Sequence, residues 1–396
     1  MSQQEFDFDK LIFPIKTNVF FSDYWEQQPL IVTREERDYY SQILSIKQIE
    51  SLIYSRRRDA TQIRVINQSQ SYFQNSTSQI NSDNIFGINE IYNAYYQGNT
   101  ITLNQLQYSC EPIAILCRNL EKLFHFQVNA SIYLTPKQAQ GIVPHYDTHD
   151  VFILQIEGSK IWHIYDYFCC LPLAKDRQPV PADQLPPRLH EVCLNAGDLI
   201  YIPRGYVHEA LTSESSSLHL TIAIHPLRLS DLITSAINLA SKDCVSLRKS
   251  LPIGFFNNKE QVGILTHQFK ELLDKITTEI NIEDVIDDLA EDLLAKLEPL
   301  PDGHFAQIDR LQNLDINSIL RKRDGIICHI LKKGDSVSIY FPGNHVSAPS
   351  FIEPALRFIA ETEEFYVNSI PGNISDESKL VLARRLVKEG LLTIVH

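Results

Sequence analysis

The fold of this chain is decided by residues 197–208, GDLIYIPRGYVH. Gly197 permits a tight turn, and the apolar residues that follow it favour a short strand. Pro203 and Gly205 then shape a second turn, which presents His208 at a fixed place. A strand held between two such turns is typical of a β-sandwich or a β-barrel.

A second short motif supplies partners for His208. His145 and Asp147 are two residues apart, so in an extended strand they project from the same face. Two imidazoles and one carboxylate suit Fe(II) or Mn(II), and they leave coordination positions open for an organic co-substrate and O₂. The H-x-D pattern alone is common. His149 and Asp150 lie close enough in sequence to compete for the same role.

Composition limits the possible functions. The chain has 396 residues with 44% hydrophobic content, enough for two or three domains, and a net charge of −13. Such acidity argues against a dedicated nucleic-acid binder. No apolar run approaches the ~20 residues of a membrane span, and the start MSQQEFDFDK lacks the apolar core of a signal peptide. Seven scattered cysteines fit a reducing compartment, so we expect a cytoplasmic protein.

The pattern of apolar residues changes twice along the chain. We expect three domains, with boundaries at residues 1–227, 228–300 and 301–396. β-rich runs dominate the end of the first domain: 128–134, 151–156, 160–165, 198–202 and 219–224. Helical periodicity marks the second, over residues 231–240, 260–276 and 282–297. The linker EPLPDG at 298–303 closes that segment.

The last domain alternates short helices and strands. Helices are expected near residues 307–314, 352–360 and 377–389, with strands around 336–340 and 391–395. Small helices with a terminal β-wing indicate a winged-helix module. Residues 301–396 hold 11 Lys and Arg against 12 Asp and Glu, whereas a DNA-binding module should be basic. We therefore expect a structural or protein-contact role.

Lys160 is a candidate for binding an anion. Residues 157–160, EGSK, predict a two-residue hairpin with Gly158 at the turn, which would place Lys160 on the face of His145 and Asp147. A buried lysine needs an anion, and Asp147 is committed to the metal. The distal carboxylate of 2-oxoglutarate is a natural partner. The alternative is an exposed lysine in a hairpin turn.

Four stretches together resemble the JmjC-type ribosomal oxygenases: residues 133–136, 140–147, 152–162 and 197–208. Residues 20–30 also resemble the entry to that family's catalytic domain. The resemblance implies an α+β protein with a double-stranded β-helix barrel of the cupin type. It further implies a helical dimerisation region and a C-terminal winged-helix domain. Beyond residue 226, the likeness rests on this layout alone.

The resemblance also implies an activity and a set of site residues. The activity is Fe(II)- and 2-oxoglutarate-dependent hydroxylation, with O₂ as a further co-substrate, of a histidine or arginine side chain in a ribosomal protein. Carried over by position, the metal ligands are His145, Asp147 and His208, and the 2-oxoglutarate residues are Lys160, Tyr133 and Thr221. No catalytic residue beyond the metal ligands is expected. Ser131 stands where relatives often have Asn, while His149, His219 and His225 are assigned structural or supporting roles.

Other functions are also compatible with these residues. The enzyme could hydroxylate another peptide, such as the precursor of a peptide natural product. A lysine demethylase fits less well, because no stretch resembles a chromatin-reading module. The metal-binding barrel could also serve as a non-enzymatic scaffold. The expected partners are a ribosomal protein or another basic peptide and a second copy of the chain, with no membrane and no direct DNA contact.

Overall fold

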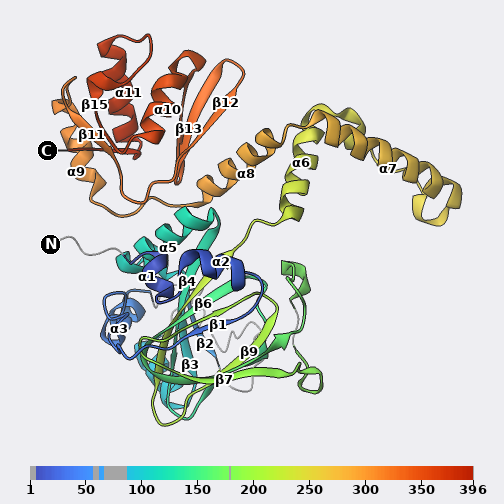
Figure 1. Ribbon diagram of the computed structural model, residues 1–396, viewed down its shortest axis with the longest axis vertical. Helices are drawn as coiled ribbons and strands as arrows, with labels where there is room; N and C mark the ends of the chain where they lie inside the picture. Colours follow the sequence, from blue (N-terminus) through green and yellow to red (C-terminus); the bar gives the residue numbers. More distant parts are fainter. Residues whose placement is uncertain (1–5, 57–61, 67–86, 178–179, 396) are drawn as a thin grey trace. The chain divides into compact units, whose positions relative to one another are not determined.

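The computed structural model describes residues 6–56, 62–66, 87–177 and 180–395. The chain divides into two compact units, Met1–Pro226 and Leu227–His396 (Figure 1). The division falls just after the last β-rich run, where alternating apolar residues give way to helical spacing. The further boundary expected near residue 300 stays a prediction.

The first unit is built on one antiparallel sheet. Its strand order is β1-β8-β6-β10-β4-β3-β2, and β9 joins β5 to the far half of β6, beside β7. The strands are β1 (Leu30–Val32), β2 (Ile63–Ile66), β3 (Thr100–Leu103), β4 (Gln127–Thr135), β5 (Gln140–His145), β6 (Asp150–Tyr167), β7 (Arg188–Asn195), β8 (Leu199–Ile202), β9 (Tyr206–Leu211) and β10 (Ser217–His225).

Helices cover one outer face of this sheet. They are α1 (Phe8–Ile12), α2 (Thr17–Asp23), α3 (Ile46–Arg56), α4 (Ile88–Tyr96) and α5 (Glu111–Phe124), with 3₁₀ turns η1 (Leu106–Tyr108), η2 (Ala174–Asp176) and η3 (Ala182–Gln184). Figure 1 shows α1, α2 and α5 gathered on one side of the strands. In α5, Ile113, Leu116 and Leu120 recur at helical spacing and are fully buried in the core between helices and sheet.

A second, smaller core lies among strands of the first unit. It contains Val151, Ile153, Trp162, Ile164, Leu194, Ile200, Ile202 and Ala210. These residues come from both halves of β6 and from β7, β8 and β9, so inward-facing side chains of opposite strands meet there. Two packed sheet faces with an apolar interior are the arrangement expected of a double-stranded β-helix barrel.

The hairpin expected at residues 157–160 is wrong. β6 continues without a turn from Asp150 to Tyr167. Its first half pairs with β10 and its second half with β7, and its register against β10 shifts between Leu218 and His219. This β-bulge adds one residue to β6 and so reverses which side chains face inward. Lys160 therefore reaches the interior through a bulge rather than a hairpin.

Gly158 makes the continuous strand possible. Its φ of +69° belongs to the left-handed region, which is why the sequence around it resembles a turn. A Cβ atom at this position would lie 1.8 Å from the carbonyl oxygen of Ser216, so only glycine fits. The same glycine thus bends β6 from one half of the sheet into the other.

The second unit begins with helices and ends in a small mixed module. Its helices are α6 (Leu229–Asp243), α7 (Lys259–Glu279), α8 (Ile282–Lys296), α9 (His304–Asp309), α10 (Glu353–Glu361) and α11 (Asp376–Lys388), and its 3₁₀ turns are η4 (Val245–Arg248), η5 (Phe255–Asn257), η6 (Arg310–Asn313), η7 (Ser350–Ile352) and η8 (Val367–Ser369). Among the described residues, no helix is long and apolar enough to cross a membrane.

Two three-stranded sheets complete the mixed module. Their orders are β15-β11-β16 and β12-β13-β14. The strands are β11 (Ile319–Lys322), β12 (His329–Lys333), β13 (Ser336–Phe341), β14 (Asn344–Pro349), β15 (Glu364–Tyr366) and β16 (Leu392–Ile394). One core cluster joins both sheets to α10 and α11, and Leu320, Val337, Leu356 and Leu386 are fully buried in it.

Candidate metal centre

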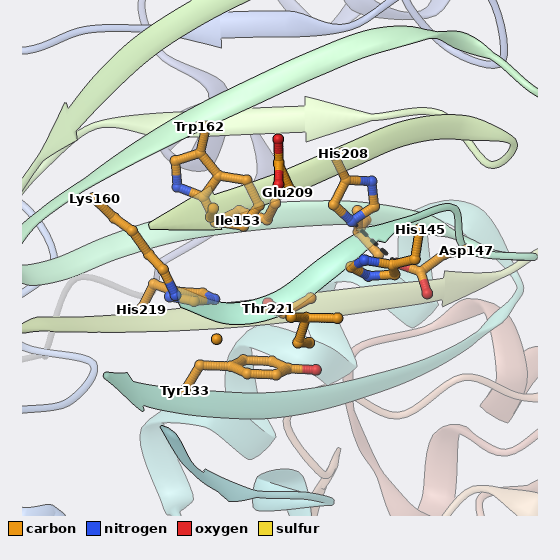
Figure 2. A pocket seen from close by; sticks show the side chains of 14 residues that line it. Tyr133, His145, Asp147, Ile153, Lys160, Trp162, His208, Glu209, His219 and Thr221 are labelled. Atoms are coloured by element: carbon orange, nitrogen blue, oxygen red, sulfur yellow. Dashed lines mark ion pairs between the residues drawn. The ribbon is translucent and has the colours of Figure 1, made fainter. Parts of the chain in front are cut away.

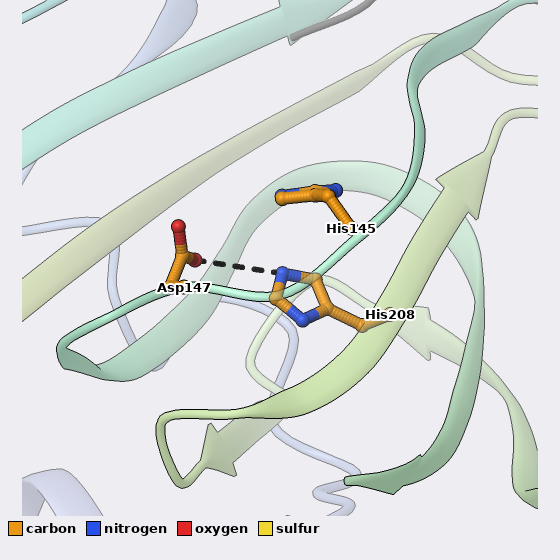
Figure 3. Close-up of side chains that lie close together, drawn as sticks. All are labelled: His145, Asp147 and His208. Atoms are coloured by element: carbon orange, nitrogen blue, oxygen red, sulfur yellow. Dashed lines mark ion pairs between the residues drawn. The ribbon is translucent and has the colours of Figure 1, made fainter. Parts of the chain in front are cut away.

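Three side chains meet inside the barrel of the first unit. His145 ends β5, His208 lies on β9, and these two residues are register partners in the antiparallel pair. Asp147 follows in the segment between β5 and β6. Potential ligand atoms of His145, Asp147 and His208 all lie within 4.8 Å of one another, and His208 Nε2 is 3.6 Å from Asp147 Oδ2 (Figure 3). The structure therefore brings together all three residues of the predicted ligand set.

The turn before His208 fixes the distance between this residue and the segment that carries His145 and Asp147. Gly205 has a φ of +92°, and a Cβ atom there would lie 1.9 Å from the carbonyl oxygen of Cys169, which excludes any other residue. Its N–H donates a 3.0 Å hydrogen bond to the carbonyl oxygen of Asp147. This bond ties the segment that carries the carboxylate to the turn that presents His208.

Backbone carbonyls orient both imidazoles. His145 Nδ1 lies 2.9 Å from the carbonyl oxygen of Val143, and His208 Nδ1 lies 3.2 Å from that of Tyr206. A carbonyl only accepts, so Nδ1 carries the proton in each ring and Nε2 carries the lone pair. Histidines that bind metals use this same outer hydrogen bond to fix their tautomer.

The protonation states suit metal coordination. Burial, reinforced by the neighbouring His208, lowers the pKa of His145 to about 4. Burial also lowers the pKa of His208, although Asp147 partly opposes this effect. For Asp147, burial would raise the pKa, but the surrounding histidines outweigh it and the pKa is lowered, with His149 contributing most. At neutral pH the site thus holds two neutral imidazoles and one carboxylate, as a divalent cation requires.

His149 and Asp150, the two residues close enough in sequence to compete for the ligand role, have other partners. Asp150 is fully buried and accepts a 2.7 Å ion-pair contact from Arg204 and a 2.9 Å hydrogen bond from the Tyr201 hydroxyl. It belongs to a structural network between β6 and β8. His149 lies beside His225, with ring centroids 4.8 Å apart, and is not part of the three-residue cluster.

A cavity adjoins the three side chains. Tyr133, Lys160 and Thr221, the residues expected to bind the co-substrate, all line it (Figure 2). Ser131 is the register partner of Thr221 but does not line the cavity. Val151 and Ile153 add apolar wall, which limits the room for water near the candidate ligands.

Lys160 is a buried cation that faces this cavity. Its Nζ donates a 3.0 Å hydrogen bond to Thr135 Oγ1, and the Thr100 hydroxyl in turn lies 3.1 Å from the same oxygen. Burial lowers the pKa of Lys160 from 10.5 to about 7. A neutral hydroxyl is a poor partner for a buried ammonium, so the site favours an incoming anion.

Sequence reasoning missed His219 and Trp162 as cavity residues. Both line the same cavity as Lys160, and His219 was assigned a structural role from its place beside the last strand. The signal was available in part, because His219 and Thr221 are two apart on β10 and hence share a face. For Trp162, the inward direction depends on the bulge in β6, which sequence does not reveal.

The residues present fit a divalent iron ion. Two neutral imidazoles and one carboxylate on one side of a cavity form the facial set used by non-haem Fe(II) enzymes. The cavity continues from this set to a buried lysine, which provides a second anchor for a bidentate organic acid. Such an arrangement can hold a metal ion and a dicarboxylate together.

Comparisons with known proteins agree with this geometry. The model of the JmjC domain family matches residues 105–232. Ribosomal oxygenase 2 of Bos taurus is 30% identical over 344 residues, which cover 81% of this chain and 72% of the relative. The bifunctional lysine-specific demethylase and histidyl-hydroxylase NO66 of Drosophila yakuba is 30% identical over 305 residues, covering 71% of this chain and 44% of the relative. The chain therefore spans less than half the length of this NO66 relative.

Solved structures show the same fold. YcfD, a ribosomal oxygenase from Escherichia coli in complex with cobalt and 2-oxoglutarate, matches with a TM-score of 0.55 at 17% identity. That match covers 97% of this chain and 99% of YcfD. A second YcfD structure, with cobalt and succinic acid, gives a TM-score of 0.54. At this identity the likeness establishes the cupin-type JmjC fold.

Proposed function

Because this chain belongs to the family of JmjC-domain ribosomal oxygenases, we propose that it is an Fe(II)- and 2-oxoglutarate-dependent oxygenase that hydroxylates a ribosomal-protein side chain. The observation that carries the proposal is the close approach of His145, Asp147 and His208 beside a cavity that contains a buried lysine. A histidine side chain is the favoured target, since the NO66 relatives are named histidyl-hydroxylases.

The bound iron, with 2-oxoglutarate and O₂, would supply the oxidation that converts a C–H bond of the substrate into C–OH and releases succinate and CO₂. The protein's task is to position the participants. His145, Asp147 and His208 would hold the metal through Nε2 and carboxylate oxygens, with the tautomers already fixed by backbone carbonyls. Substrate C–H bonds need no general base, so binding and orientation are the protein's contribution.

Lys160 would bind the distal carboxylate of 2-oxoglutarate. Its ammonium group is buried, faces the cavity and has a neutral hydroxyl as its hydrogen-bond acceptor. Tyr133 and Thr221 line the wall between Lys160 and the metal ligands, where they would contact the chain of the co-substrate. Trp162 and Ile153 would keep water from the reacting atoms.

A basic substrate suits the charge of the chain. The net charge of −13 favours encounter with positively charged segments, and ribosomal proteins are rich in these. The test is the intact mass of ribosomal proteins from cells with and without the gene. One protein lighter by one oxygen atom in the deletion strain supports the proposal and identifies the substrate.

Variants make this test specific. Complementation with the wild-type gene should restore the mass, whereas His145→Ala and Asp147→Ala should not. His190→Ala is a matched control, because His190 is exposed on β7 and away from the cavity. An unchanged mass for all ribosomal proteins would refute the ribosomal assignment. Failure of the purified protein to consume 2-oxoglutarate with peptide substrates would favour the non-enzymatic scaffold.

We further propose that the helical region of residues 228–300 mediates self-association, through α7 in particular. No residue of α7 is buried, although it contains Val262, Ile264, Phe269 and Leu273, and Phe269 is 62% exposed. Apolar side chains exposed along such a helix are typical of an interface. Light scattering should give twice the chain mass of 45.4 kDa for the wild type and one chain mass for Phe269→Glu. Val381→Glu, at an exposed position on α11, is the control, and a monomeric wild type would contradict the proposal.

We propose a structural or protein-contact role for the winged-helix-like module. Several of its basic residues are already paired with carboxylates: Lys322 with Glu363, Arg323 with Asp302, Lys332 with Glu353 and Lys333 with Glu291. Such pairs leave little positive charge for a phosphate backbone. Fluorescence anisotropy with a labelled DNA duplex at low salt should show no binding, and salt-sensitive binding would contradict this role.

A further inference from the structure

His219 packs between two aromatic rings and lines the cavity. Its ring lies parallel to that of Tyr133, at 4.9 Å between centroids and an interplanar angle of 4°. It meets Trp162 edge-on at 5.4 Å. The side chain is 3% exposed. A ring packed in this way has little room to rotate toward another hydrogen-bond partner.

One nitrogen of this ring lacks a hydrogen bond. Within the described part of the chain, His219 Nδ1 is buried and has no partner. Leaving a buried polar atom unsatisfied costs free energy, so such an atom needs an explanation. The β-bulge between Leu218 and His219 lies at the same place, and bulges commonly redirect a side chain beside an active site.

Two further groups make this end of the cavity rich in donors. The Trp162 indole N–H is also buried without a partner among the described residues, and it can only donate. Lys160 has three N–H donors, of which the bond to Thr135 accounts for one. Figure 2 shows the Lys160 amino group beside the His219 ring, and Trp162 lines the same cavity.

Space for an acceptor remains next to Lys160. A Cβ atom at Gly141 would lie 3.1 Å from Thr100 Oγ1 and 3.5 Å from Lys160 Nζ, so the glycine keeps this region open. Several hydrogen-bond donors surround a space that holds one group. We therefore expect that group to offer more than one acceptor oxygen. A carboxylate, with two oxygens and about four lone-pair directions, meets that need.

We propose that His219 is a positioning residue that donates a hydrogen bond to the distal carboxylate of the 2-oxo acid, beside Lys160. The inference rests on the proposed function, since 2-oxoglutarate is the dicarboxylate in question. A neutral imidazole suffices for this role. Burial and the charge of Lys160 lower the pKa of His219 well below its usual range, so the ring carries one proton and donates without adding charge.

The test compares two acids that differ only at the far end. 2-Oxoglutarate has a carboxylate there, and 2-oxopentanoate, with the same chain length, has a methyl group. Binding of each to the Mn²⁺-loaded full-length protein is measured by calorimetry without O₂, so no turnover is involved. The variant His219→Phe keeps an aromatic ring for Tyr133 and Trp162 but removes the nitrogens.

We expect His219→Phe to bind 2-oxoglutarate roughly 10- to 100-fold more weakly, which is the range for one hydrogen bond to a charged group. Its affinity for 2-oxopentanoate should match that of the wild type. The variant His219→Gln, which restores a donor, should recover part of the loss. His190→Phe, at an exposed position, should change neither affinity.

The outcomes are distinguishable. Equal weakening for both acids, or none for 2-oxoglutarate, would overturn the role of His219 while leaving the proposed function intact. A wild-type protein that binds Mn²⁺ but not 2-oxoglutarate would overturn both. Thermal unfolding of the empty protein guards against a folding defect, because removal of an unsatisfied nitrogen should leave Tm unchanged or raised. If His219→Phe does not fold, His219→Leu, which also lacks a donor, takes its place in the same comparison of the two acids.

Discussion

Replacement of Lys160 by methionine should stabilise the empty protein and abolish binding of the co-substrate. Burial lowers the pKa of Lys160 from 10.5 to about 7, and this fall corresponds to roughly 5 kcal/mol against the charged form. Water entry and local rearrangement relieve part of such a penalty, so we expect a gain of about 2–4 kcal/mol at pH 7. Methionine is unbranched and similar in length, so it fills the same space.

The gain should depend on pH in a defined direction. Unfolded lysine titrates near 10.5 and folded Lys160 near 7, so between these values the unfolded state binds more protons. Raising the pH through this window therefore stabilises the wild type. The advantage of Lys160→Met is largest at pH 7 and below, and it shrinks as the pH rises towards 10.5, by at most about 1.4 kcal/mol per pH unit.

Urea unfolding followed by tryptophan fluorescence can measure this effect. The chain has two tryptophans, Trp25 and Trp162, and both lie in the first unit with Lys160. Lys137→Met is the control, because Lys137 is exposed on the same unit and should show no gain. Equal or lower stability of Lys160→Met at pH 7, or a gain that does not change with pH, would refute the reasoning. Added 2-oxoglutarate with Mn²⁺ should stabilise the wild type alone.

Three more expectations concern the cavity and its support. Gly141→Ala places a methyl group beside Lys160 and should weaken 2-oxoglutarate binding roughly tenfold by calorimetry, whereas Gly263→Ala, in open space on α7, should not. Above pH 7 the affinity of the wild type for 2-oxoglutarate should fall roughly tenfold per pH unit, because only protonated Lys160 binds the carboxylate, and Lys160→Arg should give a flat profile. Arg204→Leu leaves the buried carboxylate of Asp150 without its cation and should lower the free energy of unfolding, measured with urea, by about 3–5 kcal/mol. Adding Asp150→Asn should recover much of this loss. An equally unstable double variant would contradict the pairing.

Local patterns allowed much of the fold to be predicted. The runs at 128–134, 151–156 and 219–224 lie in strands because alternating or continuous apolar residues suit a buried sheet. The three helices of residues 228–298 were likewise evident from their apolar spacing. β7 was missed because most of its residues are exposed and carry no apolar alternation. β5 was missed because a glycine and a proline interrupt it.

The sequence by itself determined the candidate metal ligands. The H-x-D spacing of His145 and Asp147, and the turn residues Pro203 and Gly205 before His208, are read directly from the chain. These features depend on residues near each other in the chain. The acidic composition likewise argued against a nucleic-acid partner without any knowledge of the fold.

Only the tertiary structure decided what surrounds Lys160. The bulge in β6 turned an expected hairpin into a continuous strand, and it sets the face on which Lys160 and Trp162 lie. His219 gains its unsatisfied nitrogen because β4, β6 and β10 bring Tyr133, Trp162 and Lys160 around it. Whether a buried polar atom has a partner depends on contacts between distant segments, and the spacing of residues along one strand carries no record of them.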